Sequence, residues 1–218
     1  MIDVRMFTVG PVQENCFIVR PKGTGRAVIV DPGDEAERLI AASETLGVEQ
    51  LEAILLTHTH FDHVGAVAPI ARASGAPVYC PELETFVLAN IMDFVPWPGF
   101  GPFESYQADH TVTGGETLEL AGLTIDVLFT PGHSPGHVTY SIRDEQALFS
   151  GDVLFQGSVG RTDLPGGDWP TLSRSIETLI NGFTPETTVY PGHMGITTLG
   201  RERATNPFLE ELAPQQPQ

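Results

Sequence analysis

The sequence LLTHTHFDHVGA at residues 55–66 joins an apolar run to four side chains that can bind metals, His58, His60, Asp62 and His63. Imidazole and carboxylate groups are costly to bury unless each finds a partner. We therefore expect this cluster to be solvated, internally hydrogen-bonded or bound to a metal ion. The rest of the chain decides among these three.

Three more apolar runs end in residues of the same kind. The stretches IDVLFTPGH, ALFSGD and TVYPGH place His133, Asp152 and His193 directly after predicted strands, each preceded by a glycine that permits a tight turn. The loops that leave the carboxyl ends of strands in α/β sheets share one edge. We therefore expect seven ligand-type side chains to converge there.

Seven candidates indicate two ions, because one catalytic ion usually takes three protein ligands and a water. The first metal is assigned His58, His60 and His133. The second is assigned Asp62, His63 and His193, and Asp152 bridges both. A single solvated loop capped by Asp62 is the alternative, and the three downstream motifs disfavour it.

The other two of the seven histidines are not expected to be ligands. His137 follows Pro135 and Gly136, and we expect it to be a hydrogen-bonded residue that opens a strand. His110 lies in a polar stretch and is expected to be exposed.

Short β-rich runs alternate with helical ones, a pattern typical of α/β layers. We expect a hairpin at residues 118–129. The expected strands are 16–19, 27–30, 53–56, 78–80, 118–120, 124–129, 138–142, 147–149 and, as the last, 187–190, and the expected helices are 35–46, 66–74, one starting at 81–84, and 169–180.

The composition favours a single domain over residues 1–218, with a frayed tail at 213–218. Acidic residues number 28 against 11 basic ones, for a net charge of -17. This balance disfavours nucleic acids and anionic membranes as partners.

The start has no signal-peptide pattern and no run approaches the ~20 apolar residues of a membrane span, so we expect a cytoplasmic protein. Cys16 and Cys80 are expected to be reduced thiols.

The segment of residues 86–106 is aromatic and rich in Pro and Gly, so it cannot be one regular helix or strand. It holds six of the chain's 18 aromatic residues. A cleft wall, a lid, an apolar plug over the sheet and an oligomer contact remain open, as does the oligomeric state.

The motifs THTHFDH, PGHSPGH, FSGDVLF, GRTDLPGGD and YPGH, in this order, resemble those of the metallo-β-lactamase superfamily, specifically its glyoxalase II-like hydrolases of the short bacterial type. The resemblance implies a four-layer αβ/βα sandwich with two mixed β-sheets and a dinuclear metal site whose ligands are the seven residues above. It also places Asp31, in the stretch IVDPG, near the metals, either as a hydrogen-bond partner or as a turn residue.

The resemblance implies hydrolysis of a thioester such as S-D-lactoylglutathione. Two divalent ions that share a water lower its pKa toward ~7 and so produce a hydroxide at neutral pH. Asp62 is expected to orient this hydroxide, and the bridging Asp152 completes the catalytic pair. Zinc is the expected metal, although iron and manganese suit the same ligands. Full-length glyoxalase II continues into a helical glutathione-binding domain, whereas only residues 194–218 follow the last ligand here.

Other members of the superfamily remain alternatives. A persulfide dioxygenase would use one iron held by the counterparts of His58, His133 and Asp152, but the stretches HFDHVGAV and YPGHMG lean toward a hydrolase. A lactonase is a weaker alternative, and a nuclease is disfavoured by the acidic charge. Many zinc β-lactamases have cysteine where this chain has Asp152, which argues against a β-lactamase. A metal-binding scaffold without activity is disfavoured by the complete ligand set.

Overall fold

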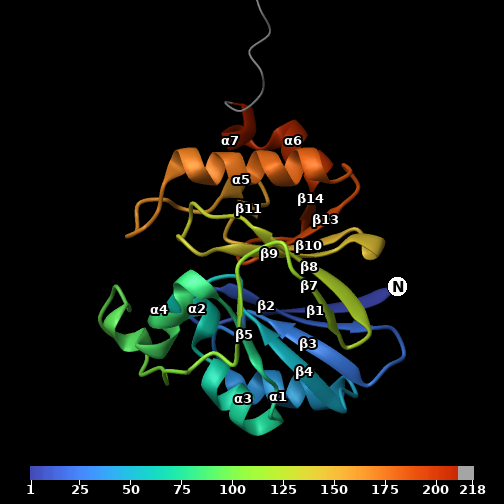
Figure 1. Ribbon diagram of the computed structural model, residues 1–218, viewed down its shortest axis with the longest axis vertical. Coiled ribbons are helices and arrows are strands. Elements are labelled where there is room, and N and C mark those ends of the chain that lie inside the picture. The colour runs from blue at the N-terminus through green and yellow to red at the C-terminus, as the bar shows by residue number, and fades with distance from the viewer. Residues whose placement is uncertain (211–218) are drawn as a thin grey trace, which may run out of the picture.

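Two six-stranded sheets lie face to face at the centre of the computed structural model, which describes residues 1–210 (Figure 1). The first sheet has the strand order β1-β2-β3-β4-β5-β6. Its strands are β1 (Ile2–Val9), β2 (Glu14–Pro21), β3 (Arg26–Val30), β4 (Gln50–Leu55), β5 (Val78–Pro81) and β6 (His110–Val112). Its first three strands run antiparallel, and the pairs β3/β4, β4/β5 and β5/β6 run parallel.

The second sheet has the order β14-β13-β10-β9-β8-β7. Its strands in chain order are β7 (Thr117–Leu120), β8 (Leu123–Phe129), β9 (Val138–Ile142), β10 (Ala147–Gly151), β13 (Thr188–Pro191) and β14 (Thr197–Thr198). The pair β10/β13 is parallel and the others are antiparallel, so both sheets are mixed. A short ribbon of β11 (Leu154–Phe155) and β12 (Ser158–Val159) lies beside them.

Helices cover the outer face of each sheet, which gives four layers (Figure 1). On the side of the first sheet are α1 (Ala36–Thr45), α2 (Phe61–Val64), α3 (Val67–Ser74) and α4 (Thr85–Ala89), and on the side of the second are α5 (Trp169–Gly182), α6 (Leu199–Thr205) and α7 (Pro207–Glu210). Three single turns of 3-10 helix complete the fold: η1 (Glu82–Glu84), η2 (Ile91–Asp93) and η3 (Arg143–Glu145). This is the α/β sandwich that the sequence predicted.

Strand alternation explains why the layers pack as they do. On β2, Phe17 and Val19 face the core between the sheets, whereas Cys16 and Ile18 face the helices on the outer side. The ring of Phe17 meets that of Phe149 from the second sheet edge-on, with centroids 5.5 Å apart. Successive side chains of a strand point to opposite faces, so a strand covered on both sides is apolar throughout.

Every helix and strand expected from the sequence is present, within a few residues at each end. The hairpin is confirmed, since β7 and β8 are joined by Ala121 and Gly122, both with positive φ as a tight two-residue turn requires. Thr187–Tyr190 is not the last strand, because β14 follows it. The sequence pattern does not predict β1, β6, β11, β12, α2, α6 and α7, most of which are too short or too polar to show periodicity.

Cys16 and Cys80 are free and buried, as expected. Within residues 1–210, no helix has both the length and the apolar character needed to cross a bilayer. The tail at 213–218 lies outside the described residues, and the single domain over 1–218 stays a prediction.

Candidate metal centre

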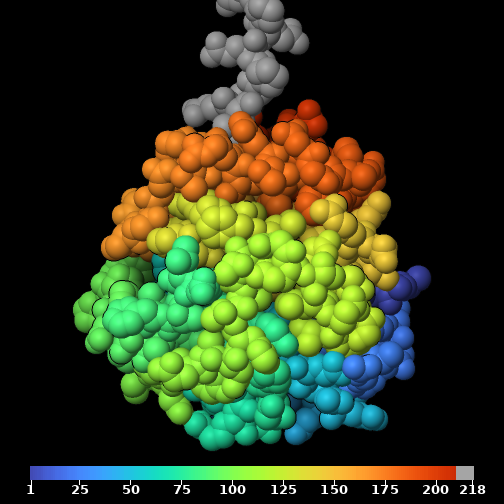
Figure 2. All heavy atoms as spheres, in the orientation of Figure 1, coloured from blue at the N-terminus to red at the C-terminus, as the bar shows by residue number. Residues whose placement is uncertain are grey.

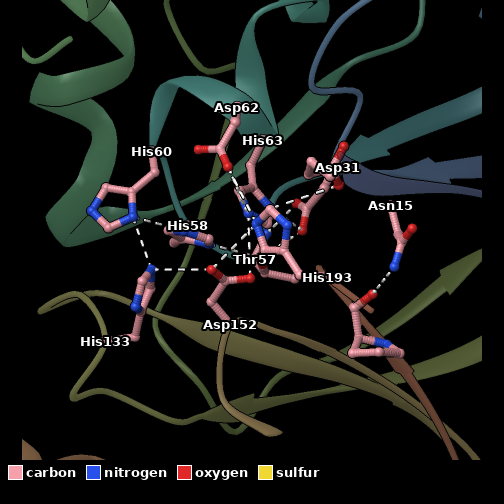
Figure 3. Close-up of polar contacts among 12 residues, drawn as sticks. Asn15, Asp31, Thr57, His58, His60, Asp62, His63, His133, Asp152 and His193 are labelled. Carbon is pink, nitrogen blue, oxygen red and sulfur yellow. Dashed lines mark hydrogen bonds and ion pairs between the residues drawn. The ribbon is translucent and has the colours of Figure 1, made fainter. Parts of the chain in front are cut away.

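The carboxyl ends of four strands meet at one edge of the sandwich. The strand β4 of the first sheet leads to His58, His60, Asp62 and His63, and β8, β10 and β13 of the second lead to His133, Asp152 and His193. The side chains of all seven point toward one another (Figure 3). The structure therefore brings together every candidate ligand, although from two sheets rather than along the edge of one.

Three imidazoles form the first group of the site. The nitrogen Nδ1 of His60 lies 3.2 Å from Nε2 of His58 and 2.8 Å from Nε2 of His133. His58 and His133 are almost completely buried. Three ring nitrogens from two distant parts of the chain thus converge on one point.

The partners of the opposite ring nitrogens fix the tautomers of two of these histidines. Thr57 Oγ1 donates its single proton to Asp31 Oδ2 at 2.6 Å, so it can only accept from His58 Nδ1 at 3.1 Å. The carbonyl oxygen of Arg161 likewise accepts from His133 Nδ1 at 2.8 Å. Both Nε2 atoms must therefore carry lone pairs toward His60, and three nitrogens with at most one proton among them suit a cation.

Asp62, His63 and His193 form the second group. Nε2 of His193 lies 3.2 Å from Asp62 Oδ2, and Nε2 of His63 lies 3.9 Å from the same oxygen. The Nδ1 atom of His63 donates to Asp31 Oδ2 at 3.1 Å, so in the neutral imidazole the lone pair is on Nε2. This group therefore also directs acceptor atoms at a common point.

Asp152 lies between the two groups. Its Oδ2 is 3.4 Å from Nε2 of His133 and 3.7 Å from Nε2 of His193, and its Oδ1 is 3.4 Å from Nε2 of His63. Within the described residues, neither Asp152 Oδ1 nor His63 Nε2 has a hydrogen-bond partner, and both are buried. When His63 is neutral, these two atoms are buried acceptors that face each other, which is expensive unless a cation lies between them, so the donor set fits divalent metals.

The electrostatics of the two groups differ. Burial, followed by repulsion from His133, lowers the pKa of His60 to about 4. Burial by itself would raise the pKa of Asp152, but attraction to His63 and two further histidines outweighs it and holds the pKa well below its usual range. Burial would lower the pKa of His63, but Asp152 and Asp62 raise it well above its usual range. His58, whose pKa burial also lowers, and His60 are thus neutral, and ionised carboxylates dominate the second group.

Asp31 is both a turn residue and a hydrogen-bond partner of the site, the two roles that the sequence left open. It turns the chain with φ of 47°. It also accepts hydrogen bonds from the backbone N–H and the hydroxyl of Thr57 and from the imidazole of His63. One buried carboxylate therefore orients a histidine of each group, His58 through Thr57 and His63 directly.

His137 and His110 lie where the sequence analysis expected. His137 is buried one residue before β9, with Nδ1 3.1 Å from Thr130 Oγ1 and Nε2 accepting from the backbone N–H of Asp152 at 3.0 Å. Both ring nitrogens are thus occupied by protein groups. His110 is exposed at the start of β6.

Two residues at the start of β2 also belong to the surroundings of the site, although the sequence pattern does not predict them. Glu14 is fully buried, its Oε1 lies 3.8 Å from His63 Nδ1, and burial raises the pKa of its carboxyl group. Asn15 donates to the carbonyl oxygens of Pro191 and Met194 and so holds the turn that carries His193 (Figure 3). Nothing in the local pattern marks them, because the contacts that tie them to the site come from segments over 40 residues away.

Glu84, in the single turn η1, was also missed. One of its oxygens accepts from Ser134 Oγ and from the backbone N–H of Gly136, and the other accepts from Thr59 Oγ1. Thr59 precedes His60, and Ser134 follows His133. A single buried carboxylate thus joins the two loops that carry two of the clustered imidazoles.

A cavity of about 870 Å³ opens over the cluster. Part of the segment 86–106 forms its wall, including Phe94 and Trp97. Phe100, Phe103 and Tyr106 instead pack against the core beside the helices of the first sheet. Of the possibilities left open by the sequence, the cleft wall is therefore present.

Comparisons with known proteins agree with this geometry. The family model described as Metallo-beta-lactamase superfamily matches residues 9–193. Hydroxyacylglutathione hydrolase GloC of Haemophilus influenzae is 36% identical over 210 residues, which cover 95% of this chain and 98% of GloC. The crystal structure of BLEG-1 B3 metallo-beta-lactamase shares 40% identity and a TM-score of 0.88 over 96% of this chain and 99% of that one. The structure of TTHA1623 in a di-iron-bound form shares 43% identity and a TM-score of 0.81 over 94% and 100%.

Proposed function

Because this chain belongs to the metallo-β-lactamase superfamily, we propose that it is a two-metal hydrolase that cleaves thioester bonds, such as that of S-D-lactoylglutathione. Membership of the superfamily supports the coarser statement, that the chain is a metal-dependent hydrolase. The thioester, the number of ions and the identity of the metal are our proposal. The observation that carries it is the position of Asp152, whose oxygens face histidines of both groups.

We assign one metal to His58, His60 and His133 and the other to Asp62, His63 and His193, with Asp152 shared. The distances and tautomers above support this partition. Zinc is the first expectation, and the di-iron form of TTHA1623 supports iron as an alternative.

When bound, two divalent ions supply a water of lowered pKa and polarise a carbonyl oxygen. The chain's own residues supply the positioning. Asp62, on the second group and lining the cavity, accepts a hydrogen bond from the attacking water and orients it. Asp31 and Thr57 keep the lone pairs of His58 and His63 directed at the metals. The reaction consumes one water and yields a free thiol and a carboxylic acid.

The substrate is proposed to be a small molecule rather than a nucleic acid. The acidic chain, with a net charge of -17, repels a phosphate backbone. The name of GloC supports the thioester, since a hydroxyacylglutathione is a thioester.

An oxygen electrode beside a thiol assay tests the proposal. Zinc-loaded and iron-loaded protein should both release thiol from S-D-lactoylglutathione under anaerobic conditions, because hydrolysis needs no oxidant. A persulfide dioxygenase would instead consume oxygen with glutathione persulfide, and only when loaded with iron. Oxygen uptake in the iron form, with no thioester cleavage in either form, would replace the hydrolase by the dioxygenase.

Hydrolysis of β-lactams is the second candidate. The similarity to BLEG-1, named a B3 metallo-beta-lactamase, favours it despite Asp152 at the position where many zinc β-lactamases have cysteine. A β-lactam is a cyclic amide, and its carbonyl can be attacked in the same way. Loss of ultraviolet absorbance from a carbapenem in the presence of zinc-loaded protein, with no thioester turnover, would select this function.

A further inference from the structure

The cavity over the metal cluster has a polar floor and apolar walls. Asp62, Asp152 and His193 lie on the floor. Its volume of about 870 Å³ is near the upper end of the ~300–1,000 Å³ typical of small-molecule sites. A thioester group occupies only a small part of such a space, so the walls must meet another part of the substrate.

Large apolar side chains are exposed at these walls. Leu83 is 65% exposed, Met194 54%, Phe94 45% and Trp97 42%. Exposed apolar side chains are ordinary when scattered, but a group lining one cavity marks a binding surface. Removing their surface from water is favourable, so an apolar ligand group would bind here well.

The aromatic wall is packed against the metal-binding motif itself. The ring of Phe61, which precedes Asp62, meets Trp97 edge-on with centroids 6.0 Å apart and an interplanar angle of 87°. Phe100 packs against both rings, 5.1 Å from Phe61 and 6.0 Å from Trp97. Figure 2 shows the surface where the segment of residues 86–106 (green) meets the segment that precedes α5 (orange). Trp97 is therefore held at a defined place beside the motif that carries Asp62.

The charges of the cavity do not suit a peptide with several carboxylates. Among the lining residues, all within the described chain, Arg161 is the one with a permanent positive charge. Its guanidinium already makes two hydrogen bonds to Asp163, at 2.6 and 2.7 Å. Asp93 and Glu84 add negative charge to the walls. Glutathione carries two carboxylates, and the one arginine among the lining residues is already paired with Asp163.

We propose that the cavity selects thioesters whose acyl group is bulky and apolar, and that Trp97 is the main determinant of this preference. The inference rests on the proposed thioester hydrolysis and names its substrate class. The acyl carbon–sulfur bond breaks, water supplies the hydroxyl of the acid and the proton of the thiol, and no oxidant or reductant is needed.

Four substrates test the preference separately from the chemistry. They combine two acyl groups, D-lactoyl and 3-phenylpropanoyl, with two thiols, glutathione and N-acetylcysteamine. We expect the 3-phenylpropanoyl esters to have the highest kcat/KM with either thiol. Trp97→Ala should lower kcat/KM for these esters about ten- to a hundredfold, mainly through KM, and change the lactoyl esters less than about threefold.

Two further variants serve as controls. Phe129 is an exposed aromatic residue on β8 that does not line the cavity, so Phe129→Ala should leave all four substrates unchanged. Trp97→Phe, which keeps an aromatic ring, should restore most of the preference. If Trp97→Ala weakens all four esters equally, or if S-D-lactoylglutathione is the preferred ester of the wild type, the inference is wrong while thioester hydrolysis stands.

Binding supplies a readout that does not depend on turnover. Trp97 and Trp169 are the two tryptophans of the chain, so Trp169→Phe leaves Trp97 as the sole reporter of the cavity. We expect its fluorescence to change on titration with the thioether S-(3-phenylpropyl)-N-acetylcysteamine. The Kd of this compound should be at least tenfold below that of S-methylglutathione. Equal or reversed affinities would overturn the inference. If no thioester is cleaved but the apolar thioether binds as expected, the proposed reaction fails and the apolar specificity remains.

Discussion

At the scale of single residues, the site depends on which ring nitrogen of each histidine carries a proton. Asp31 orients His63 directly and His58 through Thr57, and the carbonyl of Arg161 orients His133. Since these partners are protein groups with fixed roles, the Nε2 atoms face the cluster, and each carries a lone pair when its imidazole is neutral. This preorganisation is what a tight metal site requires.

Asp152 and His137 are neighbours with different expected roles. Asp152→Ala should reduce bound metal below one equivalent and remove nearly all activity, because both groups lose a shared carboxylate. His137→Asn should retain metal and cost about 1–3 kcal/mol of stability, since it unpairs Thr130 and the N–H of Asp152. Elemental analysis and urea unfolding measure both effects, with the exposed His110→Asn as control. Metal loss in His137→Asn together with full metal in Asp152→Ala would contradict this assignment.

Gly33 shows how closely the backbone approaches the site. A Cβ added there would lie 1.6 Å from the carbonyl oxygen of Asp62, which no side-chain movement can relieve. We expect Gly33→Ala to displace Asp62 and to abolish binding of the second metal, as read by competition with a chromogenic chelator. Gly182→Ala is the matched control, because a Cβ there meets nothing within 4 Å. Wild-type metal binding in Gly33→Ala would show that this loop moves freely.

At the scale of elements, the turn η1 links two loops that belong to different sheets. The loops after β4 and β8 come from different sheets, and Glu84 bridges them through Thr59, Ser134 and Gly136. The same turn leads into α4 and the aromatic cavity wall. One element thus positions both candidate ligands and the substrate wall.

Removal of this bridge should loosen the first metal group. Glu84→Ala leaves the buried N–H of Gly136 without an acceptor, so we expect a loss of about 1–3 kcal/mol in stability. Zinc affinity should also fall about 10- to 100-fold, as for other residues that orient ligands. Glu82→Ala, two residues earlier and exposed, is the control. Chemical denaturation and zinc competition measure the two effects, and an unchanged zinc affinity would reduce Glu84 to a structural role.

At the scale of the whole molecule, the metal centre joins the two halves of the sandwich. The first sheet supplies His58, His60, Asp62 and His63, and the second supplies His133, Asp152 and His193. Any ion bound between them links residues that are far apart in the chain. Metal binding should therefore stabilise the entire fold.

Metal content and thermal stability test this link together. We expect close to two metal equivalents per chain after reconstitution. Zinc at about 100 times its Kd adds about 2.7 kcal/mol for each site. For a chain of this size, that raises Tm by roughly 5–10 °C for each site. Elemental analysis and calorimetry with and without a chelator provide the measurement. A plateau at one equivalent would contradict the dinuclear assignment, and calcium, which prefers oxygen ligands, is the control.

Local pattern was sufficient for the larger elements and for the candidate ligands. Strands such as β3 and β4 alternate or run apolar because their faces are covered, and each ligand motif follows such a strand directly. The chemistry of the site is therefore visible as ligand-type residues at strand ends. Short elements such as β6, β14 and α2 have too few residues to show a period.

The sequence by itself determined the α/β alternation, the seven candidate ligands and the expectation that His137 is not one of them, because each of these depends on residue type and on spacing within its own segment. Only the tertiary structure decided that two sheets share the site and that Glu14, Asn15 and Glu84 belong to its surroundings. It also decided that Trp97 lines the cavity. The physical reason is that these contacts join segments tens of residues apart, and nothing in a local pattern records which distant group will complete a hydrogen bond or cover an apolar face.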